Sequence, residues 1–161
     1  MNMYIGLTLI VIIFFVLFFY NMKALVVDNN KKMFDFLLSL QEFPVFYEEG
    51  KNEKIKDTEN VLFLLKEIKS LYTALESVQE KTLKQRELQS NLLRFRTFLE
   101  DVSEHLKSSK IINEDSSKQI ENIKNEFLKI KTRWTNSLTI CFFIHVILFT
   151  GIFLLFVKQF A

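Results

Sequence analysis

The chain contains very few of the residues that build tight turns. Its 161 residues include three glycines, one proline and one cysteine. Phosphate-binding loops and the sharp turns that present catalytic nucleophiles depend on glycine, so three glycines leave little room for either. A single cysteine excludes an intrachain disulfide, and the chain gives no other sign of an oxidising compartment. These scarcities argue against the common enzyme frameworks, and we expect no catalytic residues.

Neither sign of charge predominates in the chain. The chain has 21 basic and 19 acidic residues, a formal net charge of +2. That balance does not indicate a nucleic-acid partner, and no basic run in the middle of the chain alternates with aromatic residues. We interpret the many Glu and Lys side chains as solvated helix faces joined by ion pairs, such as Glu67 with Lys66 and Lys69. We expect no nucleic acid, no metal and no cofactor.

Apolar residues are abundant at both ends of the chain. Residues 5–19 carry no charged side chain, and residues 138–157 carry one histidine as their only ionisable nitrogen. A helix rises about 1.5 Å per residue, so roughly 20 residues cross a hydrocarbon core of about 30 Å. The sequence therefore predicts two transmembrane helices, at residues 3–22 and 138–157.

The first apolar run could also be a cleaved signal peptide. Such peptides begin with basic residues and end at a site with small side chains. The chain begins Met-Asn-Met-Tyr and the run ends in aromatic residues, with Tyr20 at the position of an interface anchor. Trp134 has the corresponding position before the second run. We therefore interpret the first run as an uncleaved anchor.

Basic residues near the membrane predict the orientation of the two spans. One basic residue, Lys158, follows the second span, whereas six lie between the spans and close to them: Lys23, Lys31, Lys32, Lys129, Lys131 and Arg133. This asymmetry predicts a multi-pass membrane protein whose middle domain is cytoplasmic and whose short termini lie on the opposite side. The intervening stretch is longer than the loops of up to about 60 residues for which the rule is strongest.

The middle of the chain, residues 23–137, has the apolar spacing of helices. Apolar side chains recur at intervals of three and four, and the helix of the first span is expected to continue to about Glu42. Pro44 and Gly50 mark a break at 43–57, the stripe is lost near 79–89, and a polar loop is expected near 107–117. The predicted fold class is an all-α membrane protein, with two terminal transmembrane helices flanking an antiparallel helical-bundle or coiled-coil domain.

Three sites have residues suited to cap a helix start. They are Asp57 or Thr58, Thr82 with Gln85, and Ser116 with Gln119. Residues 58–107 could instead form one continuous helix, because no glycine or proline marks a turn within them. Such a rod would be about 75 Å long, more than twice the length of the helices that leave the spans. A bend near Thr82, giving an antiparallel bundle, fits those lengths better.

Two polar residues in the second apolar run are candidate intramembrane contacts. Cys141 and His145 lie one turn apart on the same helical face. A polar residue at this depth is a functional hypothesis by default. A metal or haem would need more ligands than this pair supplies. His145 could instead form a hydrogen bond to the preceding turn of its own helix. The interpretation we prefer is a contact of His145 with another subunit.

Small residues predict how the two spans pack. If the spans run antiparallel, Thr8 lies level with Thr150, and Gly6 lies near Gly151. In this register His145 faces Phe14 and Phe15, which offer it no hydrogen bond. This lack of a partner within the chain was the reason to expect one from another subunit.

Phe46 and Tyr47 lie in the break after the first long helix and form a candidate partner-binding loop. They could also close one end of the bundle as an apolar plug. We expect a non-enzymatic, membrane-anchored helical interaction protein, an accessory or scaffold subunit whose partners are the lipid bilayer and other membrane subunits or itself. The alternative is a signal-responsive or pore-forming homo-oligomer in which the soluble helices shift the spans.

Overall fold

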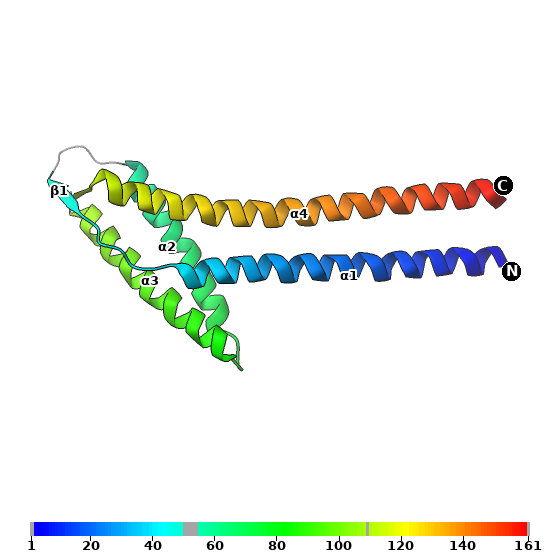
Figure 1. Cartoon of the computed structure of the whole chain (residues 1–161), viewed down its shortest axis with the longest axis horizontal. Helices are drawn as coiled ribbons and strands as arrows, with labels where there is room; N and C mark the ends of the chain where they lie inside the picture. Colours follow the sequence, from blue (N-terminus) through cyan, green and yellow to red (C-terminus); the bar gives the residue numbers. More distant parts are fainter. Residues whose placement is uncertain (1, 50–54, 109, 161) are drawn as a thin grey trace. The chain divides into compact units, whose positions relative to one another are not determined.

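The computed structural model describes residues 2–49, 55–108 and 110–160. Within these ranges the chain is mostly helical, as the sequence predicts, and two short strands accompany four helices (Figure 1). The elements in order are α1 (Asn2–Ser39), β1 (Tyr47–Glu49), α2 (Ile55–Glu76), α3 (Leu83–Lys107), β2 (Lys110–Ile112) and α4 (Glu114–Phe160).

The chain divides into two compact units. Unit 1 consists of Met1–Lys32 and Ile130–Ala161, and unit 2 consists of Met33–Lys129. Helices α1 and α4 contribute to both units without interruption. Each apolar run is thus the outer part of a longer helix whose inner part belongs to unit 2.

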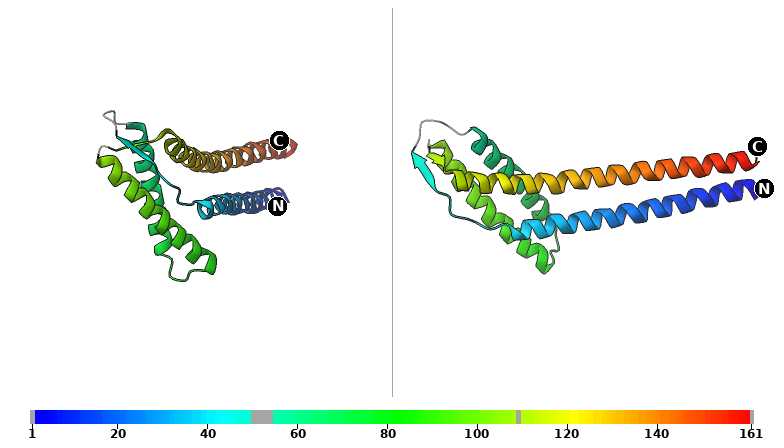
Figure 2. Two further views of the ribbon diagram at one scale, coloured as in Figure 1. Left: turned by 60° about the vertical axis from the view of Figure 1, so that its left-hand side comes forward. Right: turned by 45° about the horizontal axis from the view of Figure 1, so that its top comes forward.

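Unit 1 is a pair of helices that run side by side in opposite directions (Figure 2). Two stretches, Ile5–Ser39 and Glu114–Lys158, are long and apolar enough to cross a membrane, with mean hydropathies of 2.5 and 2.8 in their most apolar windows. Most of their large apolar side chains are exposed. A two-helix unit with an apolar outer surface has the composition of membrane-spanning helices.

Unit 2 is built on a hairpin of α2 and α3. The apolar positions predicted from the spacing of three and four are the ones that pack: Val61, Leu64 and Ile68 from α2, and Leu92, Phe95, Leu99 and Val102 from α3. Each of these side chains is almost fully buried. Full burial of one such side chain contributes about 1.5–3 kcal/mol, so this seam dominates the stability of unit 2.

The turn between α2 and α3 shows that residues 58–107 form two helices. Helix α2 ends at Glu76 and α3 begins at Leu83. The Thr82 hydroxyl accepts a hydrogen bond from Gln85 N at 3.3 Å, and Gln85 Oε1 accepts one from Thr82 N at 2.9 Å. This reciprocal pair is the predicted capping box. It starts a new helix without glycine or proline.

The other two cap predictions are wrong. Helix α4 begins at Glu114, and Asn113 Oδ1 accepts the hydrogen bond from Ser116 N at 2.9 Å, so Asn113 is the cap. The Ser116 hydroxyl instead accepts from Phe46 N at 3.3 Å. Helix α2 begins at Ile55, which places Asp57 inside its first turn, where the carboxylate accepts from the Ser117 hydroxyl. Both predicted caps are used for tertiary contacts.

Strands β1 and β2 form an antiparallel pair that the sequence did not predict. Tyr47 faces Ile112, and Glu49 faces Lys110. Asn113 N donates to Phe46 O at 2.8 Å and extends the ladder by one bond. The pair joins the segment after α1 to the segment before α4, and Ile112 is fully buried beneath it.

The carboxyl end of α1 in unit 2 is closed by a side chain from α3. Asn91 Nδ2 lies 2.7 Å from Leu37 O, 3.1 Å from Leu40 O and 3.3 Å from Leu38 O. The last carbonyl groups of a helix have no partner within the helix, and the Asn91 amide lies against two of them, at Leu37 and Leu38, and against the carbonyl of Leu40 just after the helix. This contact explains why α1 ends at Ser39, slightly before the expected Glu42.

Candidate functional site

A histidine and an asparagine from different helices meet inside unit 1. His145 of α4 is only 8% exposed, and its Nε2 lies 3.2 Å from Asn21 Nδ2 of α1. Its Nδ1 lies 2.8 Å from Cys141 O, one turn earlier in the same helix. A carbonyl oxygen only accepts, so Nδ1 carries the proton and Nε2 accepts from the Asn21 amide. Both nitrogens of a neutral imidazole are therefore satisfied.

The expectation that His145 finds no side-chain hydrogen-bond partner on the first long helix is wrong. Its two partners, Asn21 and Cys141 O, both belong to this chain. The reason is the register of the two helices. Phe14 lies against Phe149, with ring centroids 4.6 Å apart, so the facing positions are shifted by about one helical turn from those expected. In this register the amide of Asn21 lies within hydrogen-bond distance of His145.

The four small and hydroxyl residues predicted to pack between the helices do not meet as expected. A side chain added at Gly6 would lie 3.4 Å from the Phe156 ring, and nothing lies within 4 Å of Gly151. Thr150 is exposed and its hydroxyl donates to Val146 O of its own helix at 2.8 Å. Thr8 is also exposed. Gly6 therefore accommodates an aromatic ring, while Gly151 makes no close approach.

Aromatic rings pack against His145, while Asn21 is exposed. The ring centroids of Phe14 and Phe18 lie 6.0 Å and 5.2 Å from the His145 ring, both in edge-on orientations. Cys141 is buried, and its Sγ lies 3.6 Å from His145 Nδ1. The described residues contain no group of three or more His, Cys, Asp or Glu side chains that could hold a metal ion. The arrangement is a hydrogen-bonded contact in apolar surroundings.

Two grooves meet at this contact, and each has Asn21 and His145 in its lining. The first, which we call the outer groove, has a volume of about 300 Å³ and extends toward the chain ends: Ile10, Ile13, Phe14, Leu17, Leu148, Phe149 and Ile152. The second, the inner groove, has a volume of about 650 Å³ and extends the other way: Ala24, Leu25, Ser137, Ile140, Cys141 and Ile144. The polar pair thus separates two apolar grooves.

Polar residues continue along the facing sides of both helices beyond the inner groove. Asn29 follows Leu25 by four residues and is 5% exposed, and its Nδ2 is buried without a hydrogen-bond partner among the described residues. Trp134 precedes Ser137 by three residues, and its buried Nε1 also has no partner in that part of the chain. No role for Asn21 or Asn29 was predicted from the sequence. Their spacing of two helical turns was the available signal.

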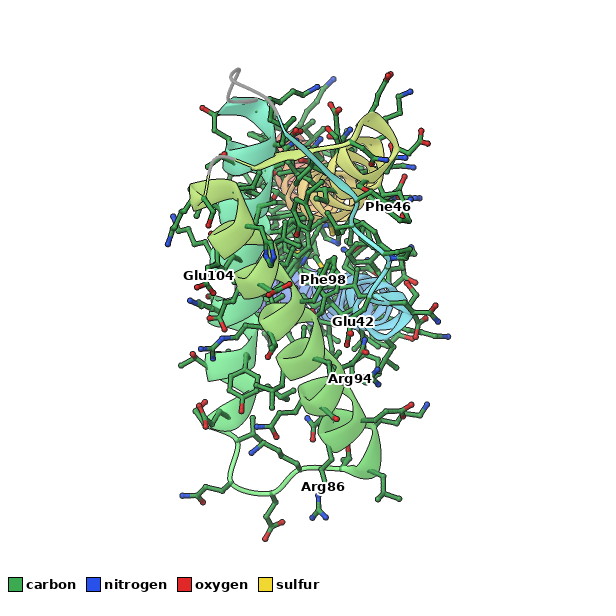
Figure 3. The ribbon with its side chains drawn as sticks, turned by 90° about the vertical axis from the view of Figure 1, so that its left-hand side faces the viewer. Glu42, Phe46, Arg86, Arg94, Phe98 and Glu104 are labelled. Atoms are coloured by element: carbon green, nitrogen blue, oxygen red, sulfur yellow. The ribbon has the colours of Figure 1, made fainter. Side chains whose placement is uncertain are left out.

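The two residues of the predicted partner-binding loop, Phe46 and Tyr47, have different surroundings. Phe46 is 60% exposed, and hydrogen bonds at both its N–H and its carbonyl hold its backbone (Figure 3). Tyr47 is half-buried and stacks on His105 with ring centroids 4.7 Å apart. Burial raises the pKa of the Tyr47 phenol, and the nearby charge of Asp101 adds to the effect. Tyr47 packs onto α3 within unit 2, while Phe46 presents an exposed aromatic ring on a backbone held by hydrogen bonds.

A polar seam joins α2 to α4 in unit 2. Lys124 Nζ donates to Asn60 Oδ1 at 2.7 Å, and Lys56 pairs with Glu121 at 2.7 Å. Asp57 Oδ2 and Asn60 Nδ2 are buried and lack partners among the described residues. The hydrogen bond and the ion pair connect α2 to α4 within unit 2.

Comparison with known proteins gives no relative for this chain. No protein-family model, no curated protein and no solved structure matches it.

Proposed function

We propose that the chain is a two-span membrane protein that acts as a non-enzymatic helical interaction subunit. Unit 1 is the membrane-embedded part, and unit 2 is a water-exposed helical bundle that presents a surface to partner subunits. The observation that carries the proposal is the continuity of α1 and α4. Each combines a bilayer-length apolar segment with a segment that belongs to unit 2.

The proposed orientation places unit 2 in the cytoplasm. Basic residues precede or follow the spans on that side, as the rule for short flanking segments requires. Labelling of cysteines tests this arrangement, because Cys141 is the only native one. In a Cys141→Ser background, a cysteine replacing exposed Ser90 should react with an impermeant maleimide only after the cytoplasmic face is opened. Reaction in intact cells would contradict the orientation.

Phe46 is the proposed contact point for a partner. An exposed aromatic side chain on a backbone held by two hydrogen bonds loses little conformational freedom on binding. Leu83, which is 83% exposed at the start of α3, offers a matched control. In Figure 3, Arg86 marks the end of the hairpin near Leu83, and Phe46 lies toward its other end. The two exposed apolar residues therefore test separate regions of unit 2.

The test is purification of the full chain in mild detergent, with its mass and its co-purifying proteins measured. We expect a stoichiometric complex that Phe46→Ala weakens at least tenfold and that Leu83→Ala leaves intact. A monomer without a stoichiometric partner would overturn the interaction function. Circular dichroism of both variants should match the native chain, since neither side chain is buried.

A second candidate function is a signal-responsive or pore-forming homo-oligomer. The observation that favours it is the same helix continuity, because movement of the inner part of α4 would be transmitted to the segment that carries His145. A closed homo-oligomer that conducts ions in planar bilayers would support this function over the scaffold.

A further inference from the structure

The contacts between α1 and α4 give one register for the whole of unit 1. The ring centroids of Phe14 and Phe149 lie 4.6 Å apart. Four residues further along α1, the Phe18 ring lies 5.2 Å from the ring of His145, which precedes Phe149 by four residues. Each step forward along α1 is thus matched by an equal step back along α4, as in any antiparallel pair of helices. Residues of the two helices can therefore be assigned to common levels.

This register brings basic residues of both helices to one level. Leu25 and Ser137 line the same groove, so the match still holds well beyond the histidine contact. Between one and two turns further on, Lys31 and Lys32 of α1 come level with residues 131–133 of α4. We call the basic residues at this level, all of them exposed, the basic collar: Lys31, Lys32, Lys131 and Arg133.

One acid lies beside the collar and does not cancel its charge. Within residues 23–32 and 130–137, Asp28 is the only acidic residue. Its carboxylate is bonded to Lys32, which is the main reason that its pKa is lowered; the charges of Arg133 and Lys31 lower it further. Because Arg133 belongs to the other helix, the charges of both helices act at the same place. Four basic side chains against one acid leave an excess of three positive charges.

The collar lies at the depth of lipid phosphates. The second apolar run begins at Leu138, and Lys131 and Arg133 precede it by about 7–11 Å of helix. A bilayer has a polar layer of roughly 5–8 Å on each side of its hydrocarbon core, and long basic side chains can extend toward it. An anionic lipid surface attracts basic residues within a Debye length, which is about 10 Å. Lipid phosphates are therefore the anions nearest to the collar.

We infer that the basic collar binds anionic phospholipid head groups in the leaflet on the unit 2 side, and so enriches these lipids around the two spans. The inference rests on the membrane placement of unit 1 proposed above. The orientation of the spans requires only that these charges stay on one side, whereas lipid binding predicts a lasting preference among lipids. A zwitterionic lipid offers no net charge in return, and an acidic protein would have to reach the same narrow level beside the bilayer.

Spin-labelled lipids measure this preference directly. The full chain is reconstituted in phosphatidylcholine vesicles, and flotation establishes that it is embedded. The fractions of spin-labelled phosphatidylglycerol and phosphatidylcholine whose motion the protein restricts are then compared. We expect a preference of at least about threefold for phosphatidylglycerol at about 0.1 M salt, falling toward parity at about 1 M salt, where the Debye length is about 3 Å. Equal association of both lipids at low salt would overturn the collar.

Two double variants separate the collar from the total charge of the chain. Lys31→Gln with Lys32→Gln removes two collar charges, and Lys107→Gln with Lys118→Gln removes two exposed charges from unit 2. The first pair should lower the preference at least about twofold, and the second should leave it unchanged. Arg133→Gln should lower it as well, because the collar includes both helices. Equal losses in the two double variants would show that only net charge matters and would refute the collar.

A soluble polyanion distinguishes lipid from an acidic protein partner. Poly-glutamate at micromolar concentration should leave the preference for phosphatidylglycerol intact. Displacement of the spin-labelled lipid by poly-glutamate, absent when Lys31 and Lys32 are both replaced by Gln, would overturn the lipid assignment in favour of an acidic protein segment. Failure of the chain to float with the vesicles would instead overturn the membrane placement, so the two proposals fail by different measurements.

Discussion

The contact between Asn21 and His145 can be tested by breaking it from each side. Asn21→Leu keeps the approximate side-chain volume and removes the donor that lies 3.2 Å from His145 Nε2. His145→Leu removes the other partner, and the double variant removes both. Asn30→Leu serves as the control, because Asn30 is exposed on the same helix.

The magnitude follows from what each variant leaves behind. In Asn21→Leu the imidazole keeps its bond to Cys141 O but Nε2, enclosed by Phe14 and Phe18, becomes an unsatisfied acceptor. An unsatisfied buried group costs roughly 1–3 kcal/mol, and hydrogen bonds between membrane helices average about 0.6 kcal/mol with a maximum near 1.7. We therefore expect Asn21→Leu to destabilise the fold by about 1–2 kcal/mol. The coupling energy between the two sites should be about 0.6–1.7 kcal/mol.

The assay is reversible unfolding in mixed micelles, followed by circular dichroism as the fraction of a denaturing detergent increases. The four species of the cycle give the coupling energy directly, and changes at independent sites add to within about 0.3–0.5 kcal/mol. Strict additivity of Asn21→Leu and His145→Leu would refute the contact. A loss in Asn30→Leu as large as in Asn21→Leu would show that the effect is not specific to the pair.

Three further predictions concern unit 2. Asn91→Leu should leave the carbonyl groups of Leu37, Leu38 and Leu40 without this donor and cost about 1–3 kcal/mol, seen as a lower denaturant midpoint of the full chain; an unchanged midpoint would exclude this cap. Thr82→Ala should cost about 0.5–2 kcal/mol in the same assay, whereas Thr82→Ser should restore most of the loss. Glu100 is bonded to Lys69 and Arg96, in that order of effect, and its pKa is lowered from 4.5. Its contribution should therefore be present above pH 4.5 and disappear as the pH falls through the lowered pKa, and Glu100→Gln should flatten the acid limb of the stability profile.

The helices were predictable because their signals are local. The apolar spacing that gives Leu64, Ile68, Leu92 and Leu99 their buried positions is visible in any short window of the sequence. The Thr82 capping box is equally local, since its two residues are three positions apart. The two long apolar runs needed only their length to be recognised as candidate spans.

The strand pair and the histidine contact depend on residues far apart in the sequence. Three-residue strands have almost no periodicity, and Ile112 is buried in a core whose other residues lie far from it in the sequence. The register between α1 and α4 depends on how large rings such as Phe14 and Phe149 fit together, which spacing alone does not encode. A shift of about one turn was enough to hide Asn21 as the partner of His145.

The paired strands β1 and β2 make the α2–α3 hairpin an insertion between two adjacent points of the chain. The polypeptide leaves the path from α1 to α4 at β1 and returns to it at β2, directly alongside. A change in the length of the α2–α3 hairpin therefore leaves the pairing of β1 and β2 in place. A fluorescent domain or an affinity tag grafted into the turn at 77–82 would lengthen the α2–α3 insertion while leaving both strands paired.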